Sequence, residues 1–148
     1  MAIALCLVSA TMCANRANLA DDNYCFACGK ANPIGLKLDF EKVNGEYVAE
    51  FTPLREHQGY AGLAHGGTIA TVLDEAIARF AWAEGGKTVT AEITVRFRKP
   101  ARTGEKLRVT GRLEEGSCRV IRGASEIRDE NGVLLAEATA KLVRTQDE

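Results

Sequence analysis

Apolar and polar residues tend to alternate through the second half of the chain, with the period of two that half-buried β-strands show. We expect four strands there, at residues 88–98, 106–113, 118–128 and 133–143. The apolar face of the first strand carries Ile93, Val95 and Phe97. The run Asp129-Glu130-Asn131-Gly132 predicts a hairpin turn between the last two strands.

The first half of the chain contains two further predicted strands. Residues 35–40 alternate apolar and polar side chains, and residues 46–51 form a second such segment that Pro53 ends. Asn44-Gly45 lies between these segments, and this dipeptide is typical of a two-residue hairpin turn. We therefore expect a hairpin before residue 53.

Between these two groups of strands, apolar residues recur at the spacing of an amphipathic α-helix. We expect this helix from about Gly67 to Ala83, where Gly85-Gly86 ends it. Its apolar stripe consists of Ile69, Val72, Leu73, Ala76, Ile77 and Phe80. The opposite side carries small residues and one acid: Gly67, Ala70, Thr71, Asp74, Ala78 and Ala81. A solvated face would carry more charge, so we expect another backbone or a substrate to approach this side closely.

Two strands, one long helix and four strands predict an α+β fold in which an antiparallel sheet of about six strands curls around the helix. The 148 residues suit one such domain. We place the domain at residues 24–148 and interpret residues 1–23 as an N-terminal extension. Residues 1–14 are apolar, but no basic residue precedes Arg16, so they do not resemble a signal peptide and are too short to cross a bilayer. We therefore expect a cytoplasmic protein.

Charge and cysteine content narrow the choice of partners. Lys and Arg number 19 against 20 Asp and Glu, which leaves a net charge of −1. We therefore expect no binding to nucleic acid or to a membrane surface, and an anionic ligand would need a local basic cluster. The five cysteines are odd in number and irregularly spaced, unlike the disulfide framework of a small secreted protein.

His65-Gly66-Gly67 lies where the helix is expected to begin. Unpaired backbone N–H groups and the positive end of the helix dipole favour negative charge there, and glycine lets a ligand approach the backbone. A carbonyl oxygen under nucleophilic attack develops such a charge. The alternative interpretation is a tight loop that His65 caps.

Asp74 lies nine residues after His65, about two and a half helical turns along, on the small-residue side of the helix. A carboxylate with little solvent around it suits proton transfer, because burial disfavours its charged form. It can activate a water or attack a carbonyl itself. The alternative is an acid that only hydrogen-bonds a neighbouring loop.

The run from Gly62 to Ala76 resembles the helix signature of the hotdog-fold thioesterases related to the phenylacetate-degradation enzyme, a PaaI-like family. The spacing from His65-Gly66-Gly67 to Asp74 is the most specific part of the match. Further matching positions extend the resemblance over residues 25–143: Gly29, Asn32-Pro33, Gly35-Leu36, Phe97 and Pro100.

The resemblance implies an acyl-CoA thioesterase that needs no cofactor and forms a homodimer or homotetramer with active sites between subunits. It implies that Gly66 and Gly67 supply oxyanion-binding N–H groups while His65 orients the loop or the substrate. Asp74 of the facing subunit would be the base or nucleophile. Thr90, sixteen residues later, matches a strand Ser or Thr that positions the water, although an ordinary strand threonine fits equally well.

Two sets of residues are expected to contact the substrate. Many relatives carry an Asn six residues before the His, where this chain has Gly59, and the neighbouring Gln58 offers a similar amide. A basic cluster around the end of a predicted strand suits the phosphates of coenzyme A, or else protects the strand edge by charge. It consists of Arg96, Arg98, Lys99 and Arg102, of which the first two are expected to share a face.

Cys25-Phe26-Ala27-Cys28-Gly29 resembles half of a zinc knuckle. Structural zinc normally takes four ligands, and the remaining Cys and His residues contain no second closely spaced pair. We therefore expect two ordinary thiols and no metal, although a dimer would bring two such pairs into one protein.

The sequence thus predicts a hydrolase that cleaves an acyl-CoA thioester. One alternative is a hotdog dehydratase or hydratase, whose characteristic His and carboxylate motifs are not found in this chain. The other is a non-catalytic domain that binds acyl-CoA. Either an aryl or an alkyl acyl group is compatible with the small residues of the helix.

Overall fold

The computed structural model describes residues 15–16 and 19–146. It contains one α-helix, α1 (Gly66–Ala83), and a short 3-10 helix, η1 (Arg55–His57). The strands are β1 (Asn15–Arg16), β2 (Glu41–Val43), β3 (Glu46–Phe51), β4 (Thr88–Phe97), β5 (Leu107–Glu114), β6 (Val120–Arg128) and β7 (Leu134–Gln146). The helix and five of the six longer strands begin and end within a few residues of their predicted positions.

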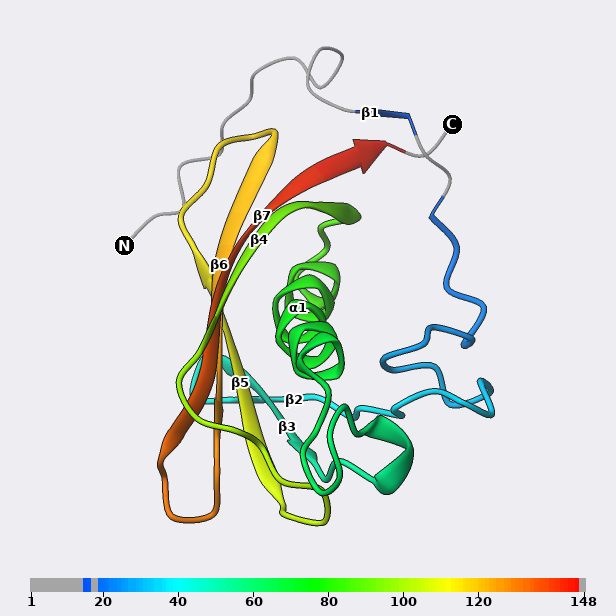
Figure 1. Cartoon of the computed structure of the whole chain (residues 1–148). Coiled ribbons are helices and arrows are strands. Elements are labelled where there is room, and N and C mark those ends of the chain that lie inside the picture. Colours follow the sequence, from blue (N-terminus) through cyan, green and yellow to red (C-terminus); the bar gives the residue numbers. More distant parts are fainter. Residues whose placement is uncertain (1–14, 17–18, 147–148) are drawn as a thin grey trace.

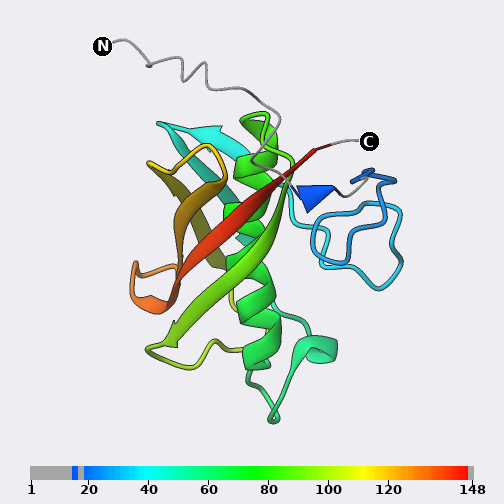
Figure 2. The same ribbon diagram turned by 90° about the horizontal axis from the view of Figure 1, so that it is seen from above.

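The sheet curls around the helix, as predicted. Strand β7 pairs antiparallel with β6 on one side and β4 on the other, and the sheet continues from β6 through β5 and β3 to β2. The two residues of β1 pair parallel with the end of β7. Figures 1 and 2 show α1 against the inner side of this sheet. The result is a hotdog architecture.

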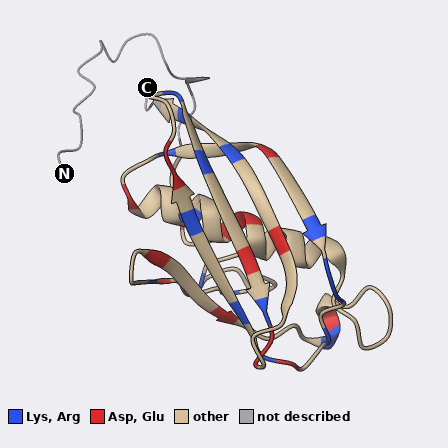
Figure 3. Cartoon of the chain, turned by 90° about the vertical axis from the view of Figure 1, so that its left-hand side faces the viewer, with Lys and Arg blue, Asp and Glu red and all other residues tan. Residues whose placement is uncertain are grey.

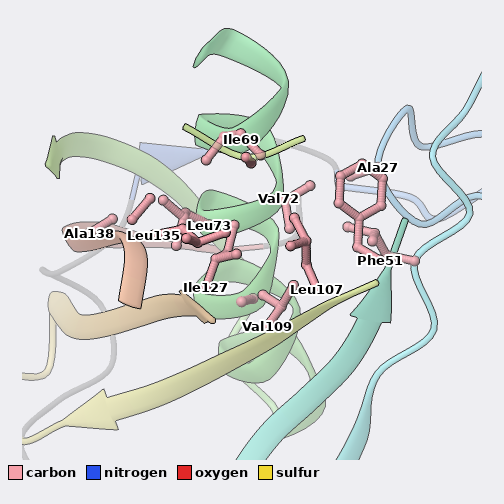
Figure 4. Packing of buried hydrophobic residues seen from close by; sticks show 14 residues of the cluster. Ala27, Phe51, Ile69, Val72, Leu73, Leu107, Val109, Ile127, Leu135 and Ala138 are labelled. Atoms are coloured by element: carbon pink, nitrogen blue, oxygen red, sulfur yellow. The ribbon is translucent and has the colours of Figure 1, made fainter. Parts of the chain in front are cut away.

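The apolar stripe of α1 forms the centre of the core. Val72, Leu73, Ala76 and Ile77 are completely buried. The first three pack in one cluster with apolar residues of the strands, among them Leu107, Val109 and Ile127, which are labelled in Figure 4. From Thr68 to Trp82 every helix residue is buried or half-buried, which confirms that the helix is surrounded on most sides.

One residue predicted to lie on the small-residue side of the helix lies in the core instead. Ala81 is completely buried and packs in a second cluster with Ile77, Ile121 and Leu142. It lies one turn beyond Ile77, near the end of the helix. Ala70, Thr71, Asp74 and Ala78 keep half-buried positions on the small-residue side.

The helix approaches β5 very closely at Gly111. A Cβ atom at that position would lie 2.3 Å from the carbonyl oxygen of Ala76. Next to this contact, the buried Ser125 hydroxyl of β6 donates a hydrogen bond of 2.8 Å to the carbonyl oxygen of Leu73. A glycine and a serine thus fix the height of the helix above the sheet.

Strand β4 contains a bulge that changes which residues face the helix. Thr90 pairs with Leu142 and Glu92 with Lys141, so Ala91 is an extra residue. Because of it, the half-buried positions change from Thr88 and Thr90 before the bulge to Ile93 and Val95 after it. Simple alternation cannot place Thr90 and Ile93 on the same face, and the bulge does.

The predicted strand at residues 35–40 is wrong. This segment is not paired in the sheet; instead the amides of Leu36 and Leu38 donate to the carbonyl oxygens of Phe26 and Ala27, at 2.8 and 2.9 Å. Lys37, between them, has a φ of 54°, which interrupts the extended backbone. The pattern alternates because Leu36 and Leu38 face the core while Lys37 and Asp39 face solvent, although the backbone bonds to residues 26–27 and not to a strand. The true partner of β3 in the predicted hairpin is β2, joined by Asn44-Gly45 as expected.

Residues 19–38 cover the side of α1 that faces away from the sheet, as both ribbon views show. Ala27 and Leu38 are buried in the core, and Asp21 forms an ion pair with Arg79 of the helix at 3.0 Å. The apolar arm predicted at residues 1–14 lies outside the described residues. Among the residues that are described, α1 is not long and apolar enough to span a membrane, and neither is η1.

Candidate active site

The helix begins at Gly66, directly after His65, as predicted. His65 is the N-cap residue, and its Nδ1 accepts a hydrogen bond of 2.8 Å from the backbone N–H of Gly67. Within the part of the chain that the structure describes, no hydrogen bond uses the N–H of Gly66, and this residue is exposed. Of the two glycines, Gly66 is therefore the better placed to bind an anionic oxygen.

The loop before the helix is held by its own backbone. His65 donates its N–H to the carbonyl oxygen of His57 at 2.7 Å, and Gly59 donates to Leu63 at 2.9 Å. The side-chain oxygen of Gln58 accepts from the N–H of Gly62 at 3.3 Å. Gly59 lies against the His65 ring, since a Cβ there would be 3.3 Å from Cδ2 of the imidazole. Gln58 and Gly59 thus shape the loop that orients His65.

Asp74 is half-buried and faces β4. The hydroxyl of Thr90 donates a hydrogen bond of 2.8 Å to its Oδ1. Burial raises the pKa of Asp74 above its usual range, and the hydrogen bond from Thr90 partly opposes that rise because it favours the charged form. Asp74 and Thr90, which the family resemblance assigns to one site, are therefore in direct contact.

Within one chain, Asp74 lies far from the start of the helix. The eight residues from Gly66 to Asp74 correspond to about 12 Å along the helix axis. A carbonyl group cannot accept from the N–H of Gly66 and also be within about 3 Å of the Asp74 carboxylate of the same chain. Within one chain, the N–H of Gly66 and the Asp74 carboxylate are therefore too far apart to act on the same carbonyl group.

A cavity of about 250 Å³ opens beside the helix start. It is lined by Gly66, Ile69 and Phe97, together with Arg98 and Lys99 from the segment after β4. The ring of Phe97 is 55% exposed and covers Gly66, with its Cζ 3.4 Å from where a Cβ of that glycine would be. Apolar and basic groups therefore meet at the N-terminal end of the helix, where Gly66 is exposed.

The basic segment is tied to the loop before the helix. Ala64 donates to the carbonyl oxygen of Ala101 at 2.8 Å, and Leu63 and Arg102 form an isolated bridge. Arg98 is already paired, because its Nε donates to Oε1 of Glu137 at 3.1 Å and its Nη2 to the same oxygen. Arg96 lies directly opposite Glu137 in the strand register and is exposed.

Charges of both signs alternate over the outer face of the sheet, as Figure 3 shows. Cross-strand ion pairs account for part of this pattern, such as Lys141 with Glu92 at 2.9 Å and Arg112 with Glu46 at 3.5 Å. The outer face of the sheet therefore carries interspersed charges of both signs.

On the other side of α1, the two cysteines of the knuckle-like run lie beside a helix residue. Cys25, Cys28 and Glu75 have ligand atoms that all lie within 4.8 Å of one another. The three residues border a cavity of about 510 Å³ between residues 19–28 and the helix, which also reaches Ala78 and Thr88.

Comparison with known proteins identifies the family. Residues 61–136, slightly more than half of the chain, match the family model of the thioesterase superfamily. The chain belongs to the thioesterase superfamily. The matched span of this superfamily member includes the helix start, Asp74, Thr90 and the basic cluster. No curated protein matches the chain.

Solved structures of this superfamily share the fold. The protein RHA08564, a thioesterase superfamily protein, is 25% identical over 82% of this chain with a TM-score of 0.77, and the match spans 63% of that protein's length. The E. coli PaaI protein from the phenylacetic acid degradation operon is 22% identical, with 74% of this chain and 84% of that one covered and a TM-score of 0.68. A hypothetical thioesterase from Streptococcus pneumoniae TIGR4, solved with coenzyme A, is 21% identical, with coverages of 75% and 88% and a TM-score of 0.68. These likenesses confirm the predicted hotdog fold.

The structure groups the predicted site residues into two sets. Asp74 and Thr90 are in contact, while His65 and Gly66 lie near the basic segment at the start of the helix. Glu75, which no sequence motif joins to the two cysteines, lies beside them in the structure. An acid on a helix otherwise poor in charge is the one sequence feature that marks it.

Proposed function

We propose that this protein hydrolyses acyl-CoA thioesters at a site shared between two copies of the chain. The main support for this proposal is the half-buried Asp74 carboxylate, which accepts a hydrogen bond from Thr90 on the small-residue side of α1. Membership of the thioesterase superfamily supports the reaction class. Hydrolysis needs both a base and an oxyanion donor, and the helix provides one of each at separate positions.

The separation of about 12 Å between Asp74 and Gly66 along one helix is the argument for a second copy. In a two-fold dimer, the helix start of one subunit faces the acid of its partner, which forms two equivalent sites. Strand β4 is the free edge of the sheet on the Thr90 side among the described strands, and Val89 on it is 40% exposed. Pairing of two such edges joins the sheets and brings the two helices side by side.

In the proposed reaction, Asp74 takes a proton from a water that Thr90 helps to hold. The water oxygen bonds to the thioester carbon, and the carbonyl oxygen becomes an oxyanion that accepts from the N–H of Gly66. The C–S bond then breaks, the electron pair leaves with sulfur, and the proton held by Asp74 goes to the CoA thiolate. The burial that raises the pKa of Asp74 strengthens it as a base. Direct attack by the Asp74 carboxylate, followed by hydrolysis of the mixed anhydride, uses the same residues.

The basic cluster is proposed to bind the phosphates of coenzyme A. The cavity beside Gly66 is lined by Arg98 and Lys99, and Arg102 belongs to the same segment. The coenzyme A in the Streptococcus pneumoniae structure supports this ligand class for the fold. Because Arg98 is paired with Glu137, we expect Arg96, Lys99 and Arg102 to contribute most of the binding.

The first experiment compares Asp74→Asn with Glu92→Gln, which neutralises an exposed acid on the outer face of β4. Thiol release from a panel of aryl- and alkyl-CoA esters is measured with a chromogenic thiol reagent. We expect Asp74→Asn to lower kcat by about 10²- to 10⁴-fold and Glu92→Gln to leave it nearly unchanged. Near-parental hydrolysis by Asp74→Asn would overturn the assignment. Tight binding with no turnover on the whole panel would instead favour an acyl-CoA binding domain, and a change in enoyl absorbance without thiol release would favour a hydratase.

The shared site is tested by mixing two inactive variants. Gly66→Pro removes the proposed donor while keeping the helix, because proline is favoured at the first helical position and His65 has a ψ of 135° that suits a following proline. When Asp74→Asn and Gly66→Pro chains are refolded together, half of the dimers are mixed and one of the two sites in each is intact. We expect about a quarter of the parental activity. No recovery in mixtures shown to contain mixed dimers would place both groups in one chain.

The basic cluster has its own test. Replacing Arg96 and Arg102 together by alanine is expected to raise KM for CoA esters more than for a thioester of pantetheine, which lacks the nucleotide. Equal effects on both substrates would remove the two arginines from the CoA site.

A further inference from the structure

We propose that Cys25, Cys28 and Glu75 bind a divalent metal ion of the zinc class. These residues come from segments 50 positions apart, and their ligand atoms all lie within 4.8 Å of one another. The site is separate from the helix start and the thioesterase proposal does not depend on it.

The backbone around the two cysteines is preformed. The N–H of Gly29 donates to the carbonyl oxygen of Cys25 at 2.8 Å, which closes the turn between the cysteines. A Cβ on Gly29 would lie 2.3 Å from the nitrogen of Cys25, so only glycine fits at this position. Asn23 supports the turn from outside, since its side-chain oxygen accepts from the N–H of Lys30 at 2.9 Å. Two thiols are thereby held on one side of a tight loop.

The spacing of the three side chains is close to that of a tetrahedral metal site. Metal–sulfur and metal–oxygen bonds of about 2.3 and 2.0 Å at tetrahedral angles separate a sulfur from an oxygen by about 3.5 Å. Sγ of Cys25 and Oε2 of Glu75 are 4.0 Å apart, and all three ligand atoms lie within 4.8 Å of one another, so an ion requires movements of about 0.5 to 1 Å. Two sulfur ligands and one carboxylate favour zinc over magnesium or calcium, which prefer oxygen ligands alone.

The electrostatic surroundings suit a cation. Glu75 is half-buried next to two thiols. A divalent ion binds cysteine as the thiolate, so both cysteines give their protons to solvent when the ion binds. Two thiolates, one carboxylate and the ion carry a net charge of −1, and Arg79, in contact with Asp21, lies near enough to Glu75 and Cys28 to interact with them.

The fourth ligand position of such an ion faces the cavity of about 510 Å³ that these three residues border. A water fills this position in three-ligand sites. The ion ties residues 19–38 to α1 at the residue next to Asp74, on a segment that otherwise relies on the Asp21–Arg79 ion pair and a few buried side chains. We infer that the metal fastens this segment over the helix.

The experiment measures zinc in the full chain and in matched cysteine variants. A triple variant with Cys6, Cys13 and Cys118 changed to serine keeps the proposed site and serves as the control. After reconstitution and removal of loose metal, the parent and the control are expected to hold about one zinc per chain. Cys28→Ser and Glu75→Gln are each expected to weaken zinc binding more than about 100-fold. Losing a residue that only hydrogen-bonds to a ligand weakens binding by roughly 10- to 100-fold. Cobalt in the parent should give a thiolate charge-transfer band that Cys28→Ser lacks.

A second measurement guards against a variant that fails to fold. In the parent and the control, zinc should protect two thiols from a thiol reagent, and a strong chelator should expose them. Zinc that binds substoichiometrically, thiol reactivity that zinc does not change, or zinc that disappears in the control would each overturn the site. Failure of Asp74→Asn to reduce thioester hydrolysis would leave these results unaffected.

Discussion

The close approach of the helix backbone to β5 at Gly111 makes Gly111→Ala an informative substitution. The added methyl carbon would lie 2.3 Å from the carbonyl oxygen of Ala76, whereas ordinary contacts begin at 3.4 Å. The backbone fixes the position of the methyl carbon, and the oxygen it meets is a backbone atom, so neither can rotate away. The helix must therefore retreat from β5 by about 1 Å, which disturbs the packing of a core without spare volume.

The cost follows from two opposing effects. Overpacking a core costs about 1–3 kcal/mol, and contact with rigid backbone places this case at the upper end. Alanine in place of glycine within a strand returns about 0.5–1 kcal/mol. We expect a net loss of about 2 kcal/mol in the free energy of unfolding, or about 4–8 °C in Tm for a chain of this length.

Urea unfolding followed by circular dichroism measures this change, with Arg108→Ala on the same strand as the control. Arg108 is exposed, so its substitution is expected to change the free energy of unfolding by no more than about 0.5 kcal/mol. Asp74 lies on roughly the opposite side of the helix from the Ala76 carbonyl, so a helix shift also changes its distance from Thr90. A displacement of about 1 Å can cost about 100-fold in turnover. Parental stability in Gly111→Ala would refute the packing argument.

Three further predictions concern Asp74 and its surroundings. Thr90→Val removes a hydrogen bond that favours the charged carboxylate, so the acid limb of the pH profile of kcat/KM should move to higher pH, while Thr94→Val on the outer face should not move it. Because burial raises the pKa of Asp74 in the folded state, its contribution to stability is present at low pH and is lost as pH rises through the folded pKa. Asp74→Asn should therefore unfold at higher urea concentration than the parent at pH 7, and the difference should shrink on acidification. Ser125→Ala removes a second, buried hydrogen bond to the Leu73 carbonyl, which keeps its helical one, and should lower the free energy of unfolding by about 0.5–1.5 kcal/mol in the same assay.

Local sequence patterns determined most of the secondary structure. The helix from Gly66 to Ala83, the hairpin turn at Asn44-Gly45 and the strands after Thr88 follow from periodicity and turn preferences, which act over a few neighbouring residues. The spacing from His65 to Asp74 also determines their positions along one helix, whatever tertiary contacts that helix makes. Patterns of this kind record which face of an element is buried.

The tertiary structure decided which groups meet. The bulge at Ala91 turns Thr90 toward Asp74, and no alternation pattern contains it. The buried backbone contact at Gly111 depends on how the helix lies across the sheet. Residues 35–40 alternate because they lie on the core, although they pair with a loop rather than with a strand. Likewise, Glu75 joins Cys25 and Cys28 only because residues 19–38 fold back over the helix. Burial on one face can be satisfied by many neighbours, so periodicity constrains the face and leaves the choice of neighbour to the packing of the whole chain.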